Sequence, residues 1–256
     1  MIYKIGRPVG RFGNNINQLI NCLYVALLNG ANRVEFDFDF LNAKYVDLVL
    51  STNTNIQIIT SCFWTSDELK SICPVFNYLP KSIKIDIANK YLRPLLIYEE
   101  SPEYNYQTGL FVHIRSGDIF RANNVHPGYA QPPLDYYVKI FGMHPEKAQF
   151  VFYEDNKNPV VNELKRLYPQ VTFGTVSQAK IIGIFMNAEH IVSGNGTFLN
   201  AIILFNNNLK AYYYPSNIPS RSGCSFGVGL PNYITTWQNT EEQRRFMLEY
   251  KSALLP

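Results

Sequence analysis

An apolar stretch of strand length runs into a polar turn at Gly109-Leu-Phe-Val-His-Ile-Arg-Ser-Gly-Asp118, and the fold class follows from this pattern. Positions 109–115 form a nearly continuous apolar run of strand length, which is typical of a buried parallel strand. Similar runs predict strands at 149–153, 171–173, 190–193 and 210–214. Apolar spacing predicts helices at 134–141, 159–168, 177–187 and 197–205. The alternation predicts a doubly wound α/β sheet whose ligand loops lie at the carboxyl ends of the strands.

The N-terminal part of the chain holds a further unit of strand, helix and strand. A short strand at 2–5 leads into a loop at 6–15 that is rich in glycine and asparagine. Apolar residues at helical spacing then follow over 16–28. Residues 33–40 alternate between apolar and polar side chains, which indicates a strand. The order of these elements is again that of an α/β unit.

The pattern is less regular between positions 41 and 104 and at the end of the chain. Short apolar runs suggest strands at 56–59 and 83–87, and residues 64–72 suggest a short helix. A terminal helix is predicted over 240–255. Neither internal repeats nor low-complexity tracts occur.

The composition is that of a folded globular protein, with 256 residues of which 46% are hydrophobic and 17% are charged. The net charge is +3 and the basic residues form no run, so the sequence predicts no nucleic-acid partner. It also predicts no membrane span, because no apolar run approaches about 18 residues. The first residues lack a signal-peptide pattern. We therefore expect a cytoplasmic protein, or a Golgi-type catalytic domain trimmed of its anchor.

The four cysteines show no spacing typical of a zinc site. Cys22 lies in the apolar helical stretch, where we expect a buried free thiol. A reducing compartment fits this usage better than an oxidising one. A bridge between Cys62 and Cys73 is the alternative for that pair.

The first candidate functional segment is the end of the quoted stretch, His113-Ile-Arg-Ser-Gly-Asp118. Arg115 follows a buried strand, and its planar guanidinium can hold a diphosphate through two parallel hydrogen bonds. Gly117 allows the backbone to approach a ligand, while Asp118 can hold the arginine or accept a proton. The alternative is an Arg–Asp pair that only ties two loops together.

The second candidate segment is Ser193-Gly-Asn-Gly-Thr197, which lies between an apolar strand and a helix. Glycines and a hydroxyl residue at a helix N-terminus make an anion site from unpaired backbone N–H groups and the helix dipole. The alternative is a helix cap with Thr197 as the N-cap residue.

Two further loops are candidates for ligand contact. Gly10-Arg-Phe-Gly-Asn14 precedes the first helix, where glycines permit tight turns or close ligand approach, although it can also be a plain connector. Val125-His-Pro-Gly-Tyr-Ala-Gln-Pro-Pro133 is stiffened by proline. There Tyr129 can stack on a sugar face while His126 or Gln131 bonds its hydroxyls. A well-packed turn is the competing account of the second loop.

The order of these motifs resembles that of the fucosyltransferase superfamily, which includes α1,2-, α1,6- and protein O-fucosyltransferases. Gly10–Asn14 is similar to the Gly-Arg-x-Gly-Asn-Gln opening of that family. Residues 113–118 resemble its His-x-Arg-Arg-Gly-Asp donor motif, and 193–198 resemble its Ser-x-Ser-Thr-Phe donor loop. Ser116 stands in place of the family's second arginine, and Asn15 in place of its glutamine. The resemblance covers about two-thirds of the chain and leaves residues 41–104 and the tail unmatched.

The resemblance implies an α/β fold of the GT-B type, with two Rossmann-like lobes facing a cleft and a small N-terminal lobe. It implies an acceptor-side lobe over 1–105, a donor-binding lobe over 106–240 and a C-terminal helix over 241–256. The implied activity is an inverting glycosyltransferase that needs no metal or other cofactor. GDP-fucose is the default donor, and an oligosaccharide or glycoprotein glycan is the acceptor.

The resemblance also implies roles for single residues. Arg115 and Asp118 are the predicted catalytic pair, with Arg115 stabilising the departing diphosphate and Asp118 the first candidate for the base. Glu154 and Asp155 are second candidates for the base, or contacts to the nucleoside. The predicted acceptor contacts are His126, Tyr129 and Gln131. The predicted donor-binding residues are Gly13, Asn14, His113, Arg115, Glu154, Ser193, Gly194, Thr197 and Phe198.

The sequence leaves other functions open. A UDP-sugar donor, for example UDP-xylose, fits the same scaffold, and the Ser116 departure also allows a catalytically inactive glycan- or nucleotide-binding module. Asp37 and Asp39 lie on one face of a strand and suggest a metal-binding Asp-x-Asp pair, although an outward polar face explains them better. A dinucleotide oxidoreductase is disfavoured, because no GxGxxG follows the first strand.

Overall fold

The computed structural model describes residues 2–5, 11–48, 79–121, 125, 131–194, 196–215 and 237–251. These residues form two compact units. The first contains the described residues within Met1–Tyr98 together with Asn200–Phe205, and the second contains those within Glu99–Leu199 and Asn206–Pro256. The domain limits implied by the family resemblance remain predictions.

The second unit is built on a five-stranded parallel sheet of order β6-β5-β4-β7-β8. Its strands are β4 (Leu110–Ile114), β5 (Gln149–Tyr153), β6 (Thr172–Gly174), β7 (His190–Ser193) and β8 (Ala211–Tyr213). The predicted parallel α/β sheet is therefore confirmed. From β4 the chain adds strands first on one side and then on the other, so the strand order reverses between β4 and β7. In such sheets ligands bind beyond the carboxyl ends of the strands at this reversal.

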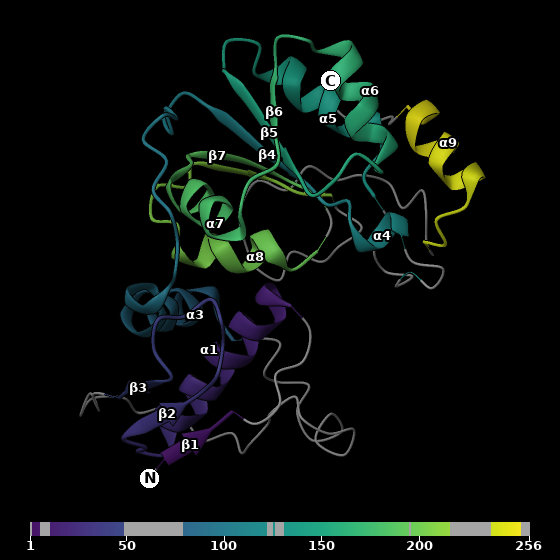
Figure 1. Cartoon of the computed structure of the whole chain (residues 1–256). Coiled ribbons are helices and arrows are strands. Elements are labelled where there is room, and N and C mark those ends of the chain that lie inside the picture. Colours follow the sequence, from purple (N-terminus) through teal and green to yellow (C-terminus); the bar gives the residue numbers. More distant parts are fainter. Residues whose placement is uncertain are drawn as a thin grey trace. The chain divides into compact units, whose positions relative to one another are not determined.

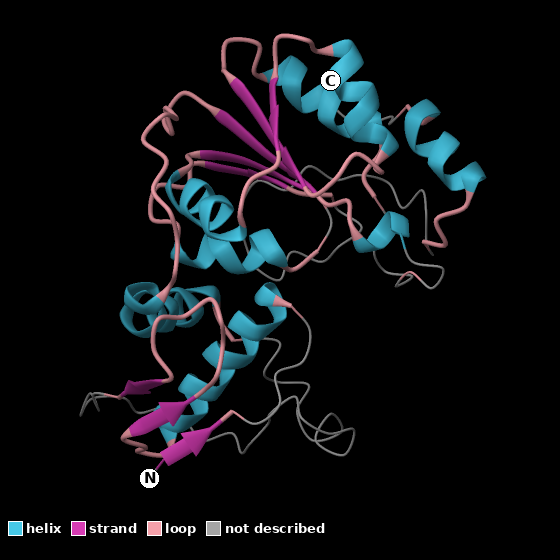
Figure 2. Cartoon of the chain, in the orientation of Figure 1, coloured by secondary structure: helices cyan, strands magenta, loops and turns pink. Residues whose placement is uncertain are grey.

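Helices cover both faces of this sheet, with α5 and α6 on one face and α7 on the other (Figure 1). Figure 2 shows the strands of this five-stranded sheet between helices. Among the described residues after β4, the helices are α4 (Asp118–Arg121), α5 (Leu134–Met143), α6 (Pro159–Leu167), α7 (Gln178–Asn187), α8 (Phe198–Ile202) and α9 (Glu241–Glu249). A 3-10 turn, η4 (Ile203–Phe205), continues α8. Asn158, Ser177 and Thr240 cap α6, α7 and α9 through their side chains.

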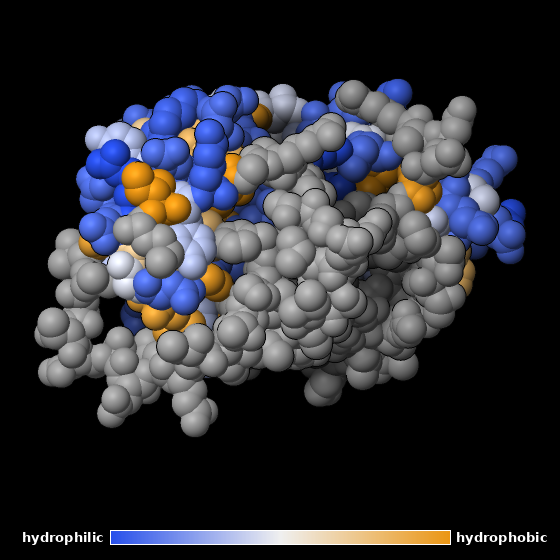
Figure 3. All heavy atoms as spheres, turned by 90° about the horizontal axis from the view of Figure 1, so that it is seen from below, coloured by the Kyte–Doolittle hydropathy of each residue, from blue (hydrophilic) through white to orange (hydrophobic). Residues whose placement is uncertain are grey.

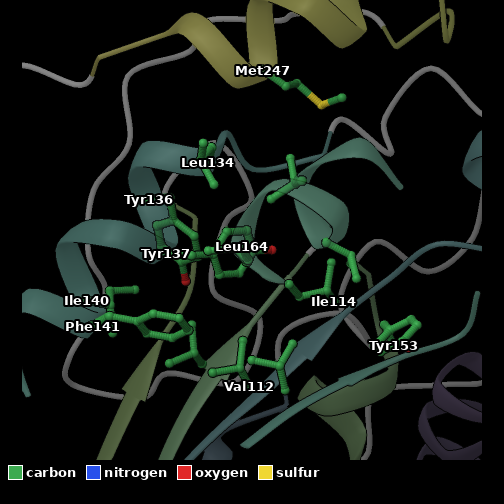
Figure 4. Packing of buried hydrophobic residues seen from close by; sticks show 14 of the residues in the cluster. Val112, Ile114, Leu134, Tyr136, Tyr137, Ile140, Phe141, Tyr153, Leu164 and Met247 are labelled. Carbon is green, nitrogen blue, oxygen red and sulfur yellow. The ribbon is translucent and has the colours of Figure 1, made fainter. Parts of the chain in front are cut away.

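The core of the second unit forms because alternate residues of each strand point to opposite faces. On one face Val112 and Ile114 pack with Tyr137, Phe141 and other buried residues of α5 and α6, as Figure 4 shows. The opposite face of the sheet is aromatic. There Phe111 stacks on Phe150, and Phe152 meets Phe185 of α7 edge to face. Burial of each large apolar side chain contributes roughly 1.5–3 kcal/mol, and this packing fixes the strands that carry the site.

The first unit contains a three-stranded sheet of order β1-β2-β3. β1 (Ile2–Lys4) and β2 (Arg33–Glu35) are parallel, and β3 (Tyr45–Asp47) is antiparallel to β2. The helix α1 (Phe12–Leu28) packs against β2 and against α3 (Lys81–Ile87). A π-helical turn, η2 (Ala88–Leu92), and a 3-10 turn, η3 (Arg93–Leu95), follow α3.

Two side chains of the first unit hold the segment after α8. Asn89 of η2 donates from Nδ2 to the carbonyl of Leu204 at 3.1 Å, and Arg93 donates from Nη1 to the carbonyl of Phe205. Arg93 also donates to Oδ1 of Asn89 at 3.3 Å. The first unit is therefore assembled from two separate stretches of the sequence.

Three expectations for the first unit need correction. Residues 83–87 were expected as a strand but form the helix α3, because their buried face continues at helical spacing through Lys84, Ile87, Ala88, Tyr91 and Leu92. The strand expected at 33–40 ends at Glu35, although Phe36 and Phe38 remain buried. The helix expected after residue 15 already begins at Phe12.

Other expectations are confirmed or lie outside the described residues. Cys22 is buried and carries a free thiol, whose pKa is raised to about 12 by burial. The elements expected at 56–59 and 64–72, and the cysteines 62, 73 and 224, lie outside the described part of the chain. The helix expected over 240–255 is present as α9 and ends at Glu249.

Among the described helices, none has both the length and the apolar character needed to cross a bilayer. On the face drawn in Figure 3, the described surface is largely hydrophilic, and hydrophobic residues form small separate patches.

Candidate functional site

The candidate site lies at the carboxyl edge of the five-stranded sheet, where β4 and β7 end side by side. His113 of β4 is paired with Ser193 of β7, and the N–H of Gly194 donates to the carbonyl of His113 at 2.8 Å. This bond extends the ladder by one step into the loop after β7. The two loops that were singled out from the sequence are therefore neighbours at the reversal of strand order.

Arg115 and Asp118 form an ion pair in the loop after β4. The Arg115 Nε atom donates to Asp118 Oδ1 at 3.2 Å, and Nη2 donates to Oδ2 at 2.8 Å. The arginine side chain is 13% exposed and the aspartate side chain 35% exposed. The pair uses one edge of the guanidinium and both carboxylate oxygens. This geometry fixes the plane of the guanidinium.

The loop after β7 approaches the other side of the same guanidinium. A β-carbon built on Gly196 would lie 2.8 Å from Nη1 of Arg115. Gly196 also has a φ of +125°, a conformation that favours glycine. The two candidate segments thus meet at Arg115, and glycine is the residue that allows this approach.

The carboxylate of the residue that follows β5 reaches the turn after Arg115. A β-carbon on Gly117 would lie 2.0 Å from Oε2 of Glu154, so the glutamate carboxylate sits against this glycine. Gly117 has a φ of +35°, which again disfavours a side chain. Glu154 follows the last residue of β5 and is exposed. The edge therefore gathers one arginine and the carboxylates of Asp118 and Glu154.

His113 lies beneath Arg115 and is 7% exposed. Burial lowers its pKa to about 4, with a further contribution from the positive charge of Arg115. Its ring lies 5.3 Å from the ring of Phe198 and 6.1 Å from that of Phe185, measured between centroids. The imidazole is neutral near pH 7, so it serves as a packed support between strand and loop.

A layer of buried polar side chains lies under the two loops. Tyr136 of α5 donates its hydroxyl to the carbonyl of Ser193 at 3.1 Å. Ser193 in turn donates from Oγ to the carbonyl of Gly194 at 2.9 Å, so its hydroxyl is used within the loop. Ser116 is fully buried, and its Oγ has no hydrogen-bond partner among the residues that the structure describes.

Asn158 is a site residue that sequence reasoning missed. It is fully buried, donates from Nδ2 to the carbonyl of Arg115 at 3.0 Å, and accepts from the N–H of Val160 at 3.0 Å. The sequence did contain one signal, because Asn followed by Pro before an amphipathic stretch is typical of a helix N-cap. Its bond to a residue 43 positions away could not be read from that pattern.

Other predicted site residues lie at the start of α8, in α1 or outside the described residues. Thr197 directly precedes α8, whose first residue is Phe198. Gly13 and Asn14 lie in the first turn of α1 in the first unit, and not in a loop. His126 and Tyr129 lie outside the described residues.

Gln131 is fully buried, and its Nε2 donates to the Tyr137 hydroxyl at 3.0 Å and to the Pro132 carbonyl at 3.3 Å. The acceptor contact of Gln131 therefore stays a prediction. Asp155 accepts at Oδ1 from the N–H of Lys157 at 2.9 Å, so it shapes the turn that leads to α6.

Asp37 and Asp39, the alternative Asp-x-Asp pair, follow β2 in the first unit. Asp37 and Asp39 are exposed, and Asp37 pairs with Lys44. Within the described part of the chain, no three His, Cys, Asp or Glu side chains gather in a way that could hold a metal ion.

A cavity of about 600 Å³ lies at the opposite, amino-terminal edge of the sheet. Its polar walls are engaged in local structure: Tyr106 donates to the Ser101 carbonyl, Asn105 accepts from the turn after it, and Asn187 donates to the Gly183 carbonyl. We therefore place the candidate site at the carboxyl edge, where a charged side chain is aimed at a glycine turn.

No protein-family model matches this chain, and no curated protein matches it at a significant level. The relation to fucosyltransferases therefore remains a resemblance carried by short motifs.

Proposed function

We propose that this protein is an inverting, metal-independent glycosyltransferase of the GT-B type that transfers fucose from GDP-fucose to a glycan hydroxyl. The observation that carries the proposal is the position of Arg115. Its guanidinium follows the central parallel strand, lies where the strand order reverses, and faces the Gly196 turn. A guanidinium beside a glycine-rich turn at this point of an α/β sheet is suited to a nucleoside diphosphate.

In the proposed reaction, the bond between the anomeric carbon of the sugar and the diphosphate oxygen breaks. The electron pair leaves with the nucleoside diphosphate, whose growing negative charge Arg115 stabilises. The acceptor hydroxyl oxygen bonds to the anomeric carbon from the opposite face, and its proton passes to a carboxylate. In these steps the atoms and electrons balance without a metal or a redox partner.

The carboxylates at this edge divide into two roles in the proposal. Both oxygens of Asp118 already accept from Arg115, which supports an orienting role for Asp118 and leaves it less suited to receive a proton. Glu154 is exposed and lies against Gly117, so it is the better candidate for the base or for a contact to the nucleoside. The alternative donor is a UDP-sugar, for example UDP-xylose, on the same scaffold.

Thermal unfolding with GDP, UDP, GDP-fucose and UDP-sugars tests the proposal. A nucleotide at 100 times its dissociation constant should stabilise the protein by about 2.7 kcal/mol. Arg115→Ala should abolish that stabilisation and lower kcat/KM about 100- to 1,000-fold. Arg166→Ala is the matched control, because the Arg166 side chain is 67% exposed and its ion pair with Glu163 lies within α6. Unchanged nucleotide binding and turnover in Arg115→Ala would contradict the proposal.

A catalytically inactive binding module is the second candidate, favoured by Ser116 in place of the second arginine. It predicts nucleotide binding that depends on Arg115, with neither sugar transfer nor donor hydrolysis. Product analysis with a panel of oligosaccharide acceptors separates the two.

A further inference from the structure

The amide of Asn158 links two parts of the second unit that meet under the candidate site. Its Nδ2 donates to the main-chain carbonyl of Arg115 at 3.0 Å, and its Oδ1 accepts from the N–H of Val160 at 3.0 Å. The residue is fully buried, so water does not replace either bond. One side chain thus serves both as the N-cap of α6 and as a support for the loop after β4.

The bond from Asn158 to Arg115 lies at the end of strand β4. The pairing of β4 with β5 ends at Ile114 and Tyr153, so the carbonyl of Arg115 is the first beyond this register. Asn158 lies in the loop that follows β5. Its side-chain amide bonds the Arg115 carbonyl just beyond the last backbone pair of β4 and β5. The carbonyl of Arg115 is therefore held by a side chain, whereas the residues of β4 before it are held by backbone pairing.

The direction of the guanidinium depends on that main chain. The Arg115 side chain bonds Asp118 along one edge and reaches Gly196 with Nη1, so a small rotation of the peptide displaces both contacts. A long side chain amplifies a shift at its base, and misplacement by about 1 Å can cost a large part of a rate enhancement.

We infer that Asn158 is a positioning residue, whose amide nitrogen holds the Arg115 peptide so that the guanidinium faces the Gly196 turn. The inference rests on the proposed function for its effect on donor binding and turnover. Its structural part, the control of Arg115 by Asn158, is independent of what the site binds.

The two ends of the amide can be tested separately. Asn158→Ser keeps an oxygen that can cap α6, because serine and asparagine are similar as N-caps, but it removes the donor to Arg115. Asn158→Asp keeps the shape and the cap acceptor but turns a second acceptor toward the Arg115 carbonyl. Ser177→Ala is the matched control, because it removes the N-cap of α7 without touching Arg115.

The first measurement is solvent exchange of the Arg115 Nε–H by ¹⁵N NMR, which needs no ligand. We expect exchange at least several-fold faster in Asn158→Ser than in wild type, and an unchanged rate in Ser177→Ala. The second measurement is GDP affinity by calorimetry, with kcat and KM for the donor. Here Asn158→Ser should weaken GDP binding about tenfold or more, and Asn158→Asp should weaken it further. If residue 158 acted only as the N-cap of α6, aspartate would leave the stability of the helix unchanged or raise it.

The outcomes separate the two proposals. Wild-type exchange of the Arg115 Nε–H in a folded Asn158→Ser variant overturns the positioning role, whatever the site binds. Faster exchange, together with a wild-type protein that binds no GDP or UDP nucleotide, supports the positioning role and overturns the proposed function. Equal loss of GDP affinity in Ser177→Ala would assign the effect to general stability and overturn the inference.

Discussion

The Nη1 atom of Arg115 lies 2.8 Å from the position that a β-carbon would take on Gly196, so the guanidinium and the turn after β7 are in direct contact. Gly196→Ala should therefore displace the guanidinium and strain the turn at a φ of +125°. We expect a loss of stability of about 1–3 kcal/mol and GDP binding weakened about tenfold or more. Urea unfolding and calorimetry measure the two effects.

Gly142→Ala is the matched control for that substitution. A β-carbon on Gly142, near the end of α5, meets no atom within 4 Å. Alanine there should leave GDP binding unchanged and stabilise the helix by up to about 1 kcal/mol. Equal changes of stability and GDP affinity in the two variants would show that the contact with Arg115 does not restrict the side chain at residue 196.

Gly117 should tolerate a side chain poorly, because its φ is +35° and the Glu154 carboxylate lies against it. A β-carbon at residue 117 would lie 2.0 Å from the Glu154 carboxylate, so Gly117→Ala must push that side chain away. We expect a destabilisation of about 1–3 kcal/mol. The double variant with Glu154→Ala should recover part of it, and the remainder reflects the φ of +35°. A full double-mutant cycle by urea unfolding measures the coupling, and zero coupling contradicts the contact.

Asp118→Asn distinguishes an orienting carboxylate from a general base. If Asp118 orients Arg115 through both oxygens, the variant should lose about tenfold to 100-fold in kcat/KM at every pH. The shape of the pH–rate profile should stay that of the wild type. Disappearance of an acidic limb from the profile would instead identify Asp118 as the base.

His113 should make the stability depend on pH. Burial and the charge of Arg115 lower its pKa in the folded protein to about 4, below the usual value of about 6.5. As the pH falls from 6.5 to 4, the unfolded chain takes up a proton that the folded protein refuses, so the free energy of unfolding falls by up to about 3 kcal/mol. Above pH 6.5 this contribution is constant. His113→Asn should show a smaller decrease over that window, and an equal decrease would contradict burial of a neutral imidazole.

Much of the second unit could be predicted from the sequence because its strands are short apolar runs separated by amphipathic helices. β5 and β7 have the predicted limits, since a strand buried on both faces leaves little doubt about its ends. Residues 83–87 show the limit of this reasoning. Their apolar and polar side chains alternate over five positions, and only the continuation to Leu92 reveals a helical face. β3 was missed because an exposed edge strand carries a weak hydrophobic pattern.

The sequence predicts those parts of the candidate site whose functional residues stand in short motifs at the ends of strands. Arg115, Asp118 and the glycine turn after β7 stand in motifs whose loops follow adjacent strands, and parallel pairing brings them together. The contacts of Asn158 and Tyr136 depend on tertiary packing that no short window records. The sequence pattern predicts a helix start after residue 15, later than the observed start at Phe12, because glycine and asparagine at residues 13 and 14 favour a loop.

The first unit draws its last segment, Asn200–Phe205, from beyond the whole of the β4–β7 region, and Asn89 and Arg93 hold the carbonyls of that segment. A protease cut near residue 98 would therefore not release two self-sufficient halves. The amino-terminal fragment would lack the peptide that satisfies these donors, and the remaining fragment would carry that peptide with its partners removed. We therefore expect the two fragments to fold better when they are combined than when either is expressed alone.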